Sequence, residues 1–120
     1  MTNPHVPAFP SAVRGIATIL LLAMGVAIGL GVASGVNFIE TVRAWAADPW
    51  GRATLVDLYA GFILFAAWIA HRERSALKAV LWLAGTCCLG NVVPCIYLLI
   101  AAKSAGGDGT VFWHGRVGRD

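Results

Sequence analysis

The stretch Asp48–Lys78 reads DPWGRATLVDLYAGFILFAAWIAHRERSALK, and it decides the fold. Asp48 can cap a helix with its carboxylate, and Pro49 suits the first helical position, where its missing N–H would have no partner. The apolar run from Ala53 to Ala70 is about as long as a helix needs to cross roughly 30 Å of hydrocarbon. We therefore predict a transmembrane helix over residues 53–70, the middle one of three.

Composition points to the same class of protein. Of the 120 residues, 58% are hydrophobic and only 12% are charged, whereas soluble domains carry about 25% charged residues. The net charge is +3, but the basic residues lie outside the apolar runs. They are therefore expected to set topology and contact lipid headgroups, and we predict no nucleic-acid partner.

Two further apolar runs complete an all-α membrane protein of three transmembrane helices. The first helix is predicted over residues 13–38 and the third over residues 79–102, with a kink at Gly90-Asn91 and Pro94. Between helices 1 and 2, residues 38–50 indicate a short amphipathic segment lying in the membrane interface. In helix 1, small residues at spacing four predict close helix packing through Gly25, Gly29, Gly31 and Gly35.

The remaining residues form two ends. Residues 1–13 are predicted to be an extended proline-containing arm, residues 14–103 the transmembrane domain, and residues 104–120 a Gly-rich tail with an apolar docking segment at Val111–His114. The run from Ile16 to Val36 is longer than a signal peptide's apolar region, so we expect a retained helix. Neither end can fold alone, so we expect contacts outside the small core to order both.

Basic residues suggest an orientation. Arg72, Arg74 and Lys78 crowd the loop between helices 2 and 3, and such clusters favour the cytoplasm. With three spans, this predicts a cytoplasmic N-terminus and a periplasmic C-terminus in a bacterial inner membrane.

Polar residues inside the spans are candidates for function because burying them is costly. They are Asp57, Asn91 and Tyr97. Asp57 could pair with Arg43 or Arg52, or accept a hydrogen bond from Tyr97. We favour the interpretation that this group ties the helices together over an ion pathway.

Aromatic residues recur at spacing three at Tyr59, Phe62, Phe65 and Trp68. Such a ridge usually packs against other helices, but it could also stack on a carotenoid, quinone or chlorophyll. His71, at the end of the same helix, is a weak candidate ligand for a haem or chlorophyll metal. The sequence contains no catalytic signature, no histidines at metal spacing and no CxxC motif, so we predict neither a catalytic nor a metal site.

Two groups of motifs carry a family resemblance. Asp48-Pro49-Trp50-Gly51, Asp57-Leu58-Tyr59 and Trp68–Glu73 are followed by Leu89-Gly90-Asn91, Pro94 and Tyr97. Together they resemble a family of small bacterial membrane proteins of unknown function, over approximately residues 14–103. The resemblance implies a three-helix fold and transfers no catalytic residue or cofactor.

We therefore expect a non-catalytic accessory subunit of a larger membrane complex, respiratory or photosynthetic, and not an enzyme. Its partners would be other integral membrane subunits and lipids, and no cofactor is predicted. Two alternatives stay open: a binder of a lipophilic pigment or quinone, and a small homo-oligomeric ion or solute transporter that uses Asp57 and Asn91.

Overall fold

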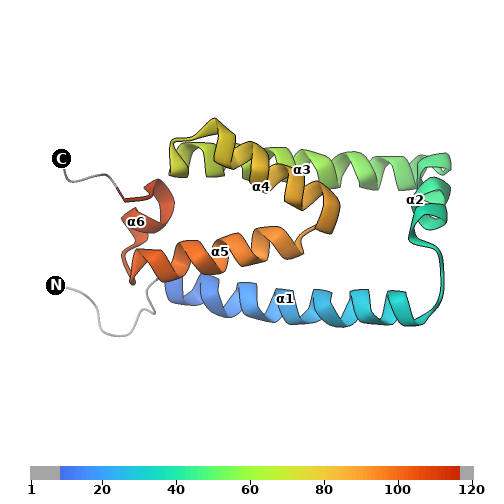
Figure 1. Cartoon of the computed structure of the whole chain (residues 1–120), viewed down its shortest axis with the longest axis horizontal. Coiled ribbons are helices and arrows are strands. Elements are labelled where there is room, and N and C mark those ends of the chain that lie inside the picture. The colour runs from blue at the N-terminus through green and yellow to red at the C-terminus, as the bar shows by residue number, and fades with distance from the viewer. Residues whose placement is uncertain (1–8, 117–120) are drawn as a thin grey trace.

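A computed structural model describes residues 9–116, and this part of the chain is all helical. The helices are α1 (Phe9–Ala33), α2 (Phe38–Ala47), α3 (Pro49–Glu73), α4 (Ala76–Leu89), α5 (Val92–Ala105) and α6 (Gly109–His114). The long helices α1 and α3 run along opposite sides of the molecule, and α4 and α5 form a hairpin that fills part of the space between them (Figure 1). The short helix α2 connects the two long helices at one end, and α6 closes the other end (Figure 1).

Among residues 9–116, two helices and not three are long and apolar enough to cross a membrane. They lie at residues 10–33 and 49–73, with mean hydropathies of 2.5 and 1.8. The prediction of three transmembrane helices is therefore wrong in number, although the all-helical class is confirmed. The difference arises in the third predicted span, which the structure divides into two shorter apolar helices, α4 and α5.

The division lies at Gly90. Its φ of 68° and ψ of −154° belong to a region that is open almost only to glycine, so the α4 helix cannot continue through it. Pro94 is the third residue of α5, within the first turn, where the missing proline N–H costs no helical hydrogen bond. The single kinked helix predicted over residues 79–102 is therefore wrong, because Gly90 ends one helix and Pro94 belongs to the start of another.

The reversal at Gly90 returns the chain to its starting end. α5 packs along α1, and α6 contacts α1, α3 and α5. The start of α1 and Arg116 consequently lie at the same end of the molecule (Figure 1). The expectation that the two ends of the chain lie on opposite sides depended on a third full span, and the structure does not support it.

The local sequence explains how α2 is joined to α3. The carboxylate of Asp48 accepts a hydrogen bond from the backbone N–H of Gly51 at 2.7 Å, and Pro49 is the first residue of α3, which confirms the predicted cap. A Cβ on residue 51 would overlap the carbonyl of Trp45. Glycine at this position therefore allows α2 to pack closely against the start of α3.

Both predicted ends differ from expectation. Residues 9–13 belong to α1, and Pro10 is fully buried, so this part of the predicted extended arm is helical; residues 1–8 lie outside the described part. The predicted apolar docking segment forms α6, whose Phe112 is 2% exposed in a core with Ile69 and Tyr97. Contacts within the chain therefore order α6, contrary to our expectation that contacts outside the core would be needed.

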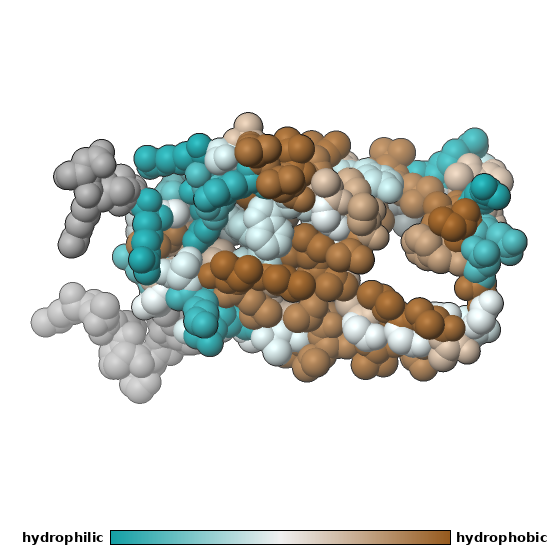
Figure 2. Space-filling model, viewed as in Figure 1, coloured by the Kyte–Doolittle hydropathy of each residue, from teal (hydrophilic) through white to brown (hydrophobic). Residues whose placement is uncertain are grey.

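Hydropathy separates the molecule into zones. In the space-filling view, hydrophilic residues gather at the two ends of the long axis, and the middle is mainly hydrophobic (Figure 2). Most apolar side chains of α1 are exposed, including Ile19, Leu22, Leu30 and Val32. The fold thus has an apolar waist between two polar ends.

Candidate functional site: a buried arginine network and a polar cavity

The most densely connected polar side chain in the described part of the chain is Arg72, in the last turn of α3. Its side chain is 7% exposed. Its Nε donates to the carbonyl oxygen of Phe112 at 2.8 Å, and one Nη donates to the Ser104 hydroxyl at 2.9 Å. The other Nη donates to Glu73 Oε1 at 2.8 Å and to the Tyr97 hydroxyl at 3.2 Å. One guanidinium group therefore connects α3, α5 and α6.

Glu73 completes the network. Its Oε1 also accepts the hydroxyl hydrogen of Tyr97 at 2.8 Å, and its Oε2 lies 3.5 Å from Lys78 Nζ. Arg72, Glu73 and Tyr97 thus form a closed triangle of hydrogen bonds in which a buried charge is paired and fully bonded. Such a pair fixes geometry strongly, because removing Glu73 would leave the buried guanidinium of Arg72 without its counter-charge.

The local sequence explains why Arg72 is buried. Phe62, Ala66 and Ile69 form the buried stripe of α3, and Arg72 continues it one turn later. The helix then ends at Arg74, which adopts a left-handed conformation with φ 52°. Just after α6, a Cβ at position 115 would overlap the backbone carbonyl of Arg72. Gly115, with φ 74°, therefore allows the end of α6 to approach the end of α3.

An aromatic cluster packs beside this network, centred on Trp68. Its ring lies 5.7 Å from the ring of Tyr97, 5.6 Å from that of Phe112 and 5.9 Å from that of Trp113. Its indole N–H donates to the carbonyl oxygen of Trp113 at 3.3 Å. Edge-to-face contacts of this kind stabilise packing beyond the burial of area alone, so the cluster fastens α6 onto α3 and α5.

His71 and His114 are also brought together at this end. Their Nε2 and Nδ1 atoms lie 3.2 Å apart, in hydrogen-bonding contact. Among residues 9–116, no group of three or more His, Cys, Asp or Glu side chains is arranged to hold a metal ion. The ring nitrogens of His71 thus lie beside a second imidazole, and what the pair contributes is a link between α3 and α6.

The predicted aromatic ridge is divided between two environments. Tyr59 and Phe62 make an edge contact at 5.7 Å, in the first part of α3. Phe65 lies 5.5 Å from Trp68 and 5.8 Å from Tyr97, so its ring belongs to the cluster described above. The second half of the ridge therefore packs against α5 and α6.

The three polar residues predicted inside the spans, Asp57, Asn91 and Tyr97, lie in two different places in the structure. Tyr97 lies in the Arg72 network, whereas Asp57 and Asn91 line a cavity of about 300 Å³ together with Leu58, Gly61, Phe62, Phe65 and Pro94. The predicted pairing of Asp57 with Tyr97 is wrong, because the hydroxyl of Tyr97 donates to Glu73. No ion pair joins Asp57 to Arg43 or Arg52 within residues 9–116.

Glycines of α1 were predicted to pack against helices. A Cβ placed on Gly25, Gly29 or Gly31 would meet no atom within 4 Å, so the described part of the chain leaves these backbones uncovered. Gly35 lies beyond the end of α1 with φ 72°. A left-handed residue just after a helix terminates it, so Gly35 has a backbone role at that position.

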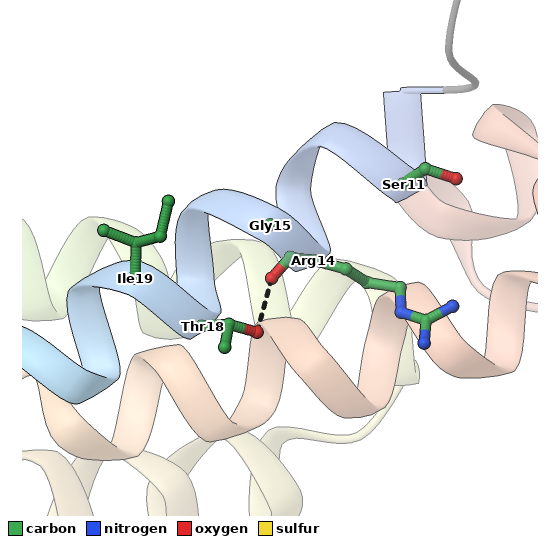
Figure 3. A pocket seen from close by; sticks show the side chains of 5 residues that line it. All are labelled: Ser11, Arg14, Gly15, Thr18 and Ile19. Carbon is green, nitrogen blue, oxygen red and sulfur yellow. Dashed lines mark hydrogen bonds between the residues drawn. The ribbon is translucent and has the colours of Figure 1, made fainter.

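A shallow hollow of about 500 Å³ lies on α1, and Figure 3 shows its lining residues Ser11, Arg14, Gly15, Thr18 and Ile19. The one hydrogen bond drawn among them joins the Thr18 hydroxyl to the Arg14 carbonyl oxygen at 2.7 Å (Figure 3). All of these residues come from a single helix. The hollow is therefore a helix surface and not a built site.

Sequence reasoning missed the Arg72 network. The sequence carried one signal, because a stripe of apolar residues at spacing three and four continues onto a charged residue. Ser104 and Phe112 gave no comparable signal, since their roles depend on the reversal at Gly90.

Comparison with known proteins places the chain in a family. No curated protein and no solved structure matches it. Residues 8–110 match the family model described as protein of unknown function (DUF1475). This match covers most of the chain, including the α4–α5 hairpin and the first residues of α6. The chain therefore belongs to the DUF1475 family of proteins of unknown function.

Proposed function

We propose that this chain is an integral membrane protein that crosses the bilayer twice, through α1 and α3. The α4–α5 hairpin would enter from one side and return to it. The apolar waist and the two polar ends support this placement (Figure 2), as do the mean hydropathies of the two long helices. α3, with 25 residues, is about 37 Å long at 1.5 Å per residue, enough to cross roughly 30 Å of hydrocarbon.

The distribution of basic residues supports an orientation. Near the end where α3 finishes lie Arg14, Arg72, Arg74, Lys78, Lys103 and Arg116; near the end where α2 lies are only Arg43 and Arg52, among residues 9–116. Cytoplasmic loops carry the excess of Lys and Arg. We infer that the α6 end faces the cytoplasm and the α2 end faces the opposite side, in a bacterial inner membrane.

Within that membrane, the function that the geometry supports best is that of a non-catalytic accessory subunit. The observation that carries it is the uncovered backbone of α1 at Gly25, Gly29 and Gly31. Glycine costs a helix about 1 kcal/mol relative to alanine, and in lipid this cost is offset where another helix approaches the backbone closely. No described residue of this chain does so, and we propose that the approaching helix belongs to another protein.

Two of the uncovered glycines, Gly25 and Gly29, define a docking face, whereas Gly31 lies about 160° from Gly29 around the helix and is not part of it. Successive residues turn about 100° around a helix, so Gly25 and Gly29 lie about 80° to 120° from Ala17, the buried residue of α1 that packs in the core. Their face is turned about a right angle from the buried stripe of α1, so a partner helix can reach it without displacing the hairpin. Other integral subunits of a respiratory or photosynthetic complex are the expected partners, with lipid covering the rest of α1.

Enlarging the glycines tests this proposal. The tagged full chain is expressed in its own host, extracted in mild detergent and separated by native electrophoresis. We expect the wild type to migrate in a complex with other proteins, and Gly29→Leu to release it as a free chain. The matched control is Leu20→Phe, which also enlarges an exposed apolar position but lies about 180° from Gly29 around α1, and it should leave the complex intact.

Two results would contradict the proposal. One is a wild-type chain that migrates alone, or only with copies of itself. The other is Gly29→Leu and Leu20→Phe having the same effect on the complex.

A further inference from the structure

Beyond the tip of the α4–α5 hairpin, the space between α1 and α3 is not filled by the chain (Figure 2). A cavity of about 300 Å³ lies at this tip. Its lining comes from α3, through residues such as Asp57, Phe62 and Phe65, and from the hairpin, through Asn91 and Pro94. Phe65 borders both this cavity and the aromatic cluster, whereas the Arg72 network lies in the last turn of α3 and shares no residue with the cavity.

The carboxylate of Asp57 has no partner in the described part of the chain. No hydrogen bond or ion pair reaches it from residues 9–116, where the ion pairs of Glu73 with Arg72 and Lys78 are found instead. Arg52 lies five residues earlier on the same helix, about 140° away around the axis, and therefore cannot pair with it as a neighbouring turn would.

Asp57 also lies well inside α3. It is the ninth residue of the helix, about 12 Å from the start at 1.5 Å per residue. In the membrane placement proposed above, on which this inference rests, that position is within the hydrocarbon region. A carboxylate there is costly unless a counter-charge compensates it, and the cavity is where a counter-charge can enter.

The rest of the cavity defines what kind of cation fits. The side chains of Phe62, Phe65, Leu58 and Pro94 give the cavity apolar and aromatic walls. The Asn91 side chain makes no cap hydrogen bond, so its amide oxygen can accept one from a ligand N–H. A small inorganic ion would leave the aromatic and apolar walls unused, whereas an organic ammonium ion contacts both kinds of surface.

We propose that the cavity at the hairpin tip binds a monovalent organic cation, an ammonium group on an aromatic or aliphatic body. Asp57 supplies the counter-charge, Phe62 and Phe65 contact the body, and Asn91 accepts from an ammonium N–H where one is present.

The test uses phenyltrimethylammonium as the probe, with the purified full chain in neutral-lipid nanodiscs and binding measured by isothermal titration calorimetry. We expect saturable binding by the wild type. Asp57→Asn should weaken it at least tenfold, and Asp57→Glu should retain it within about threefold. Glu40→Gln, which removes a carboxylate from α2, is the matched control and should leave binding unchanged. tert-Butylbenzene has the same shape without the charge and should compete poorly.

The proposal is overturned if the wild type does not bind the probe, if Asp57→Asn binds as tightly as the wild type, or if tert-butylbenzene competes equally well. Without the probe, Asp57→Asn should unfold at a temperature no lower than that of the wild type, because the described residues make no bond to the carboxylate and its charge is costly in the hydrocarbon region. Alkaline carbonate extraction of membranes from cells that express the chain distinguishes a failure of the cation site from a failure of the proposed membrane placement. A chain that resists extraction but fails to bind contradicts the cation site alone, and a chain that is extracted contradicts the membrane placement.

Discussion

The guanidinium of Arg72 donates through Nε to the carbonyl oxygen of Phe112, 2.8 Å away, and so joins the last turn of α3 to α6. Phe112 is itself buried in the core with Tyr97 and Ile69. This buried polar contact therefore links α6 to the end of α3, and several consequences can be measured.

Replacing Arg72 by methionine should destabilise the protein by about 3 kcal/mol, because it keeps the apolar volume but leaves Glu73 and the Phe112 carbonyl without their buried donor. Thermal or denaturant unfolding in detergent measures this. Arg74→Gln removes a nearby exposed arginine and should change stability by less than about 0.5 kcal/mol. Equal effects of the two substitutions would show that charge alone, and not the network, matters.

Gly115→Ala should loosen α6. The added Cβ would overlap the Arg72 carbonyl, and the positive φ of 74° is unfavourable for alanine, so we expect a loss of more than about 1 kcal/mol. Gly109→Ala is the control, since an added Cβ there meets nothing within 4 Å. Faster proteolysis of the C-terminal segment in Gly115→Ala, but not in Gly109→Ala, is the expected readout.

The hairpin predicts that both described ends of the chain lie on one side of the membrane. Single cysteines at Ser11→Cys and Arg116→Cys, with the three native cysteines replaced, should react with a membrane-impermeant maleimide from the same side. Ala46→Cys in α2 should react only from the other side. Labelling of Arg116→Cys together with Ala46→Cys would instead support three full spans and refute the hairpin.

The contact between His71 and His114 should make a small but measurable contribution to the free energy of unfolding. Both side chains are exposed, so a double-mutant cycle with His71→Ala and His114→Ala should give a coupling of about 0.5 kcal/mol. Strictly additive losses would mean that the 3.2 Å contact contributes nothing to the docking of α6.

The sequence alone was sufficient to predict those features that depend on residues close together in the chain. Asp48 and Pro49 start α3 as predicted, because a cap needs only the next three residues. The amphipathic pattern after Phe38 likewise predicts the α2 helix. Helix existence and the starts of helices were therefore accessible from the sequence.

The third apolar run was not resolved by the same reasoning. Gly90 and Pro94 are compatible with a kinked helix or with a break, and the choice depends on contacts distant in sequence. Folding back lets the Tyr97 hydroxyl reach Glu73, 24 residues earlier. Arg72 was assigned to a topology-setting loop for the same reason: its burial requires Ser104 and α6 to return to it.

The reversal at Gly90 also bears on how the protein would be inserted. If the chain is embedded as proposed, everything synthesised after α3 remains on the ribosome's side, and only the connection around α2 must be carried across. The charged side chains of residues 34–52 are Glu40, Arg43, Asp48 and Arg52, so the translocated segment is electrically balanced. The insertion machinery would therefore move no net charge through the bilayer, while the arginine-rich end acts as an anchor that is never translocated.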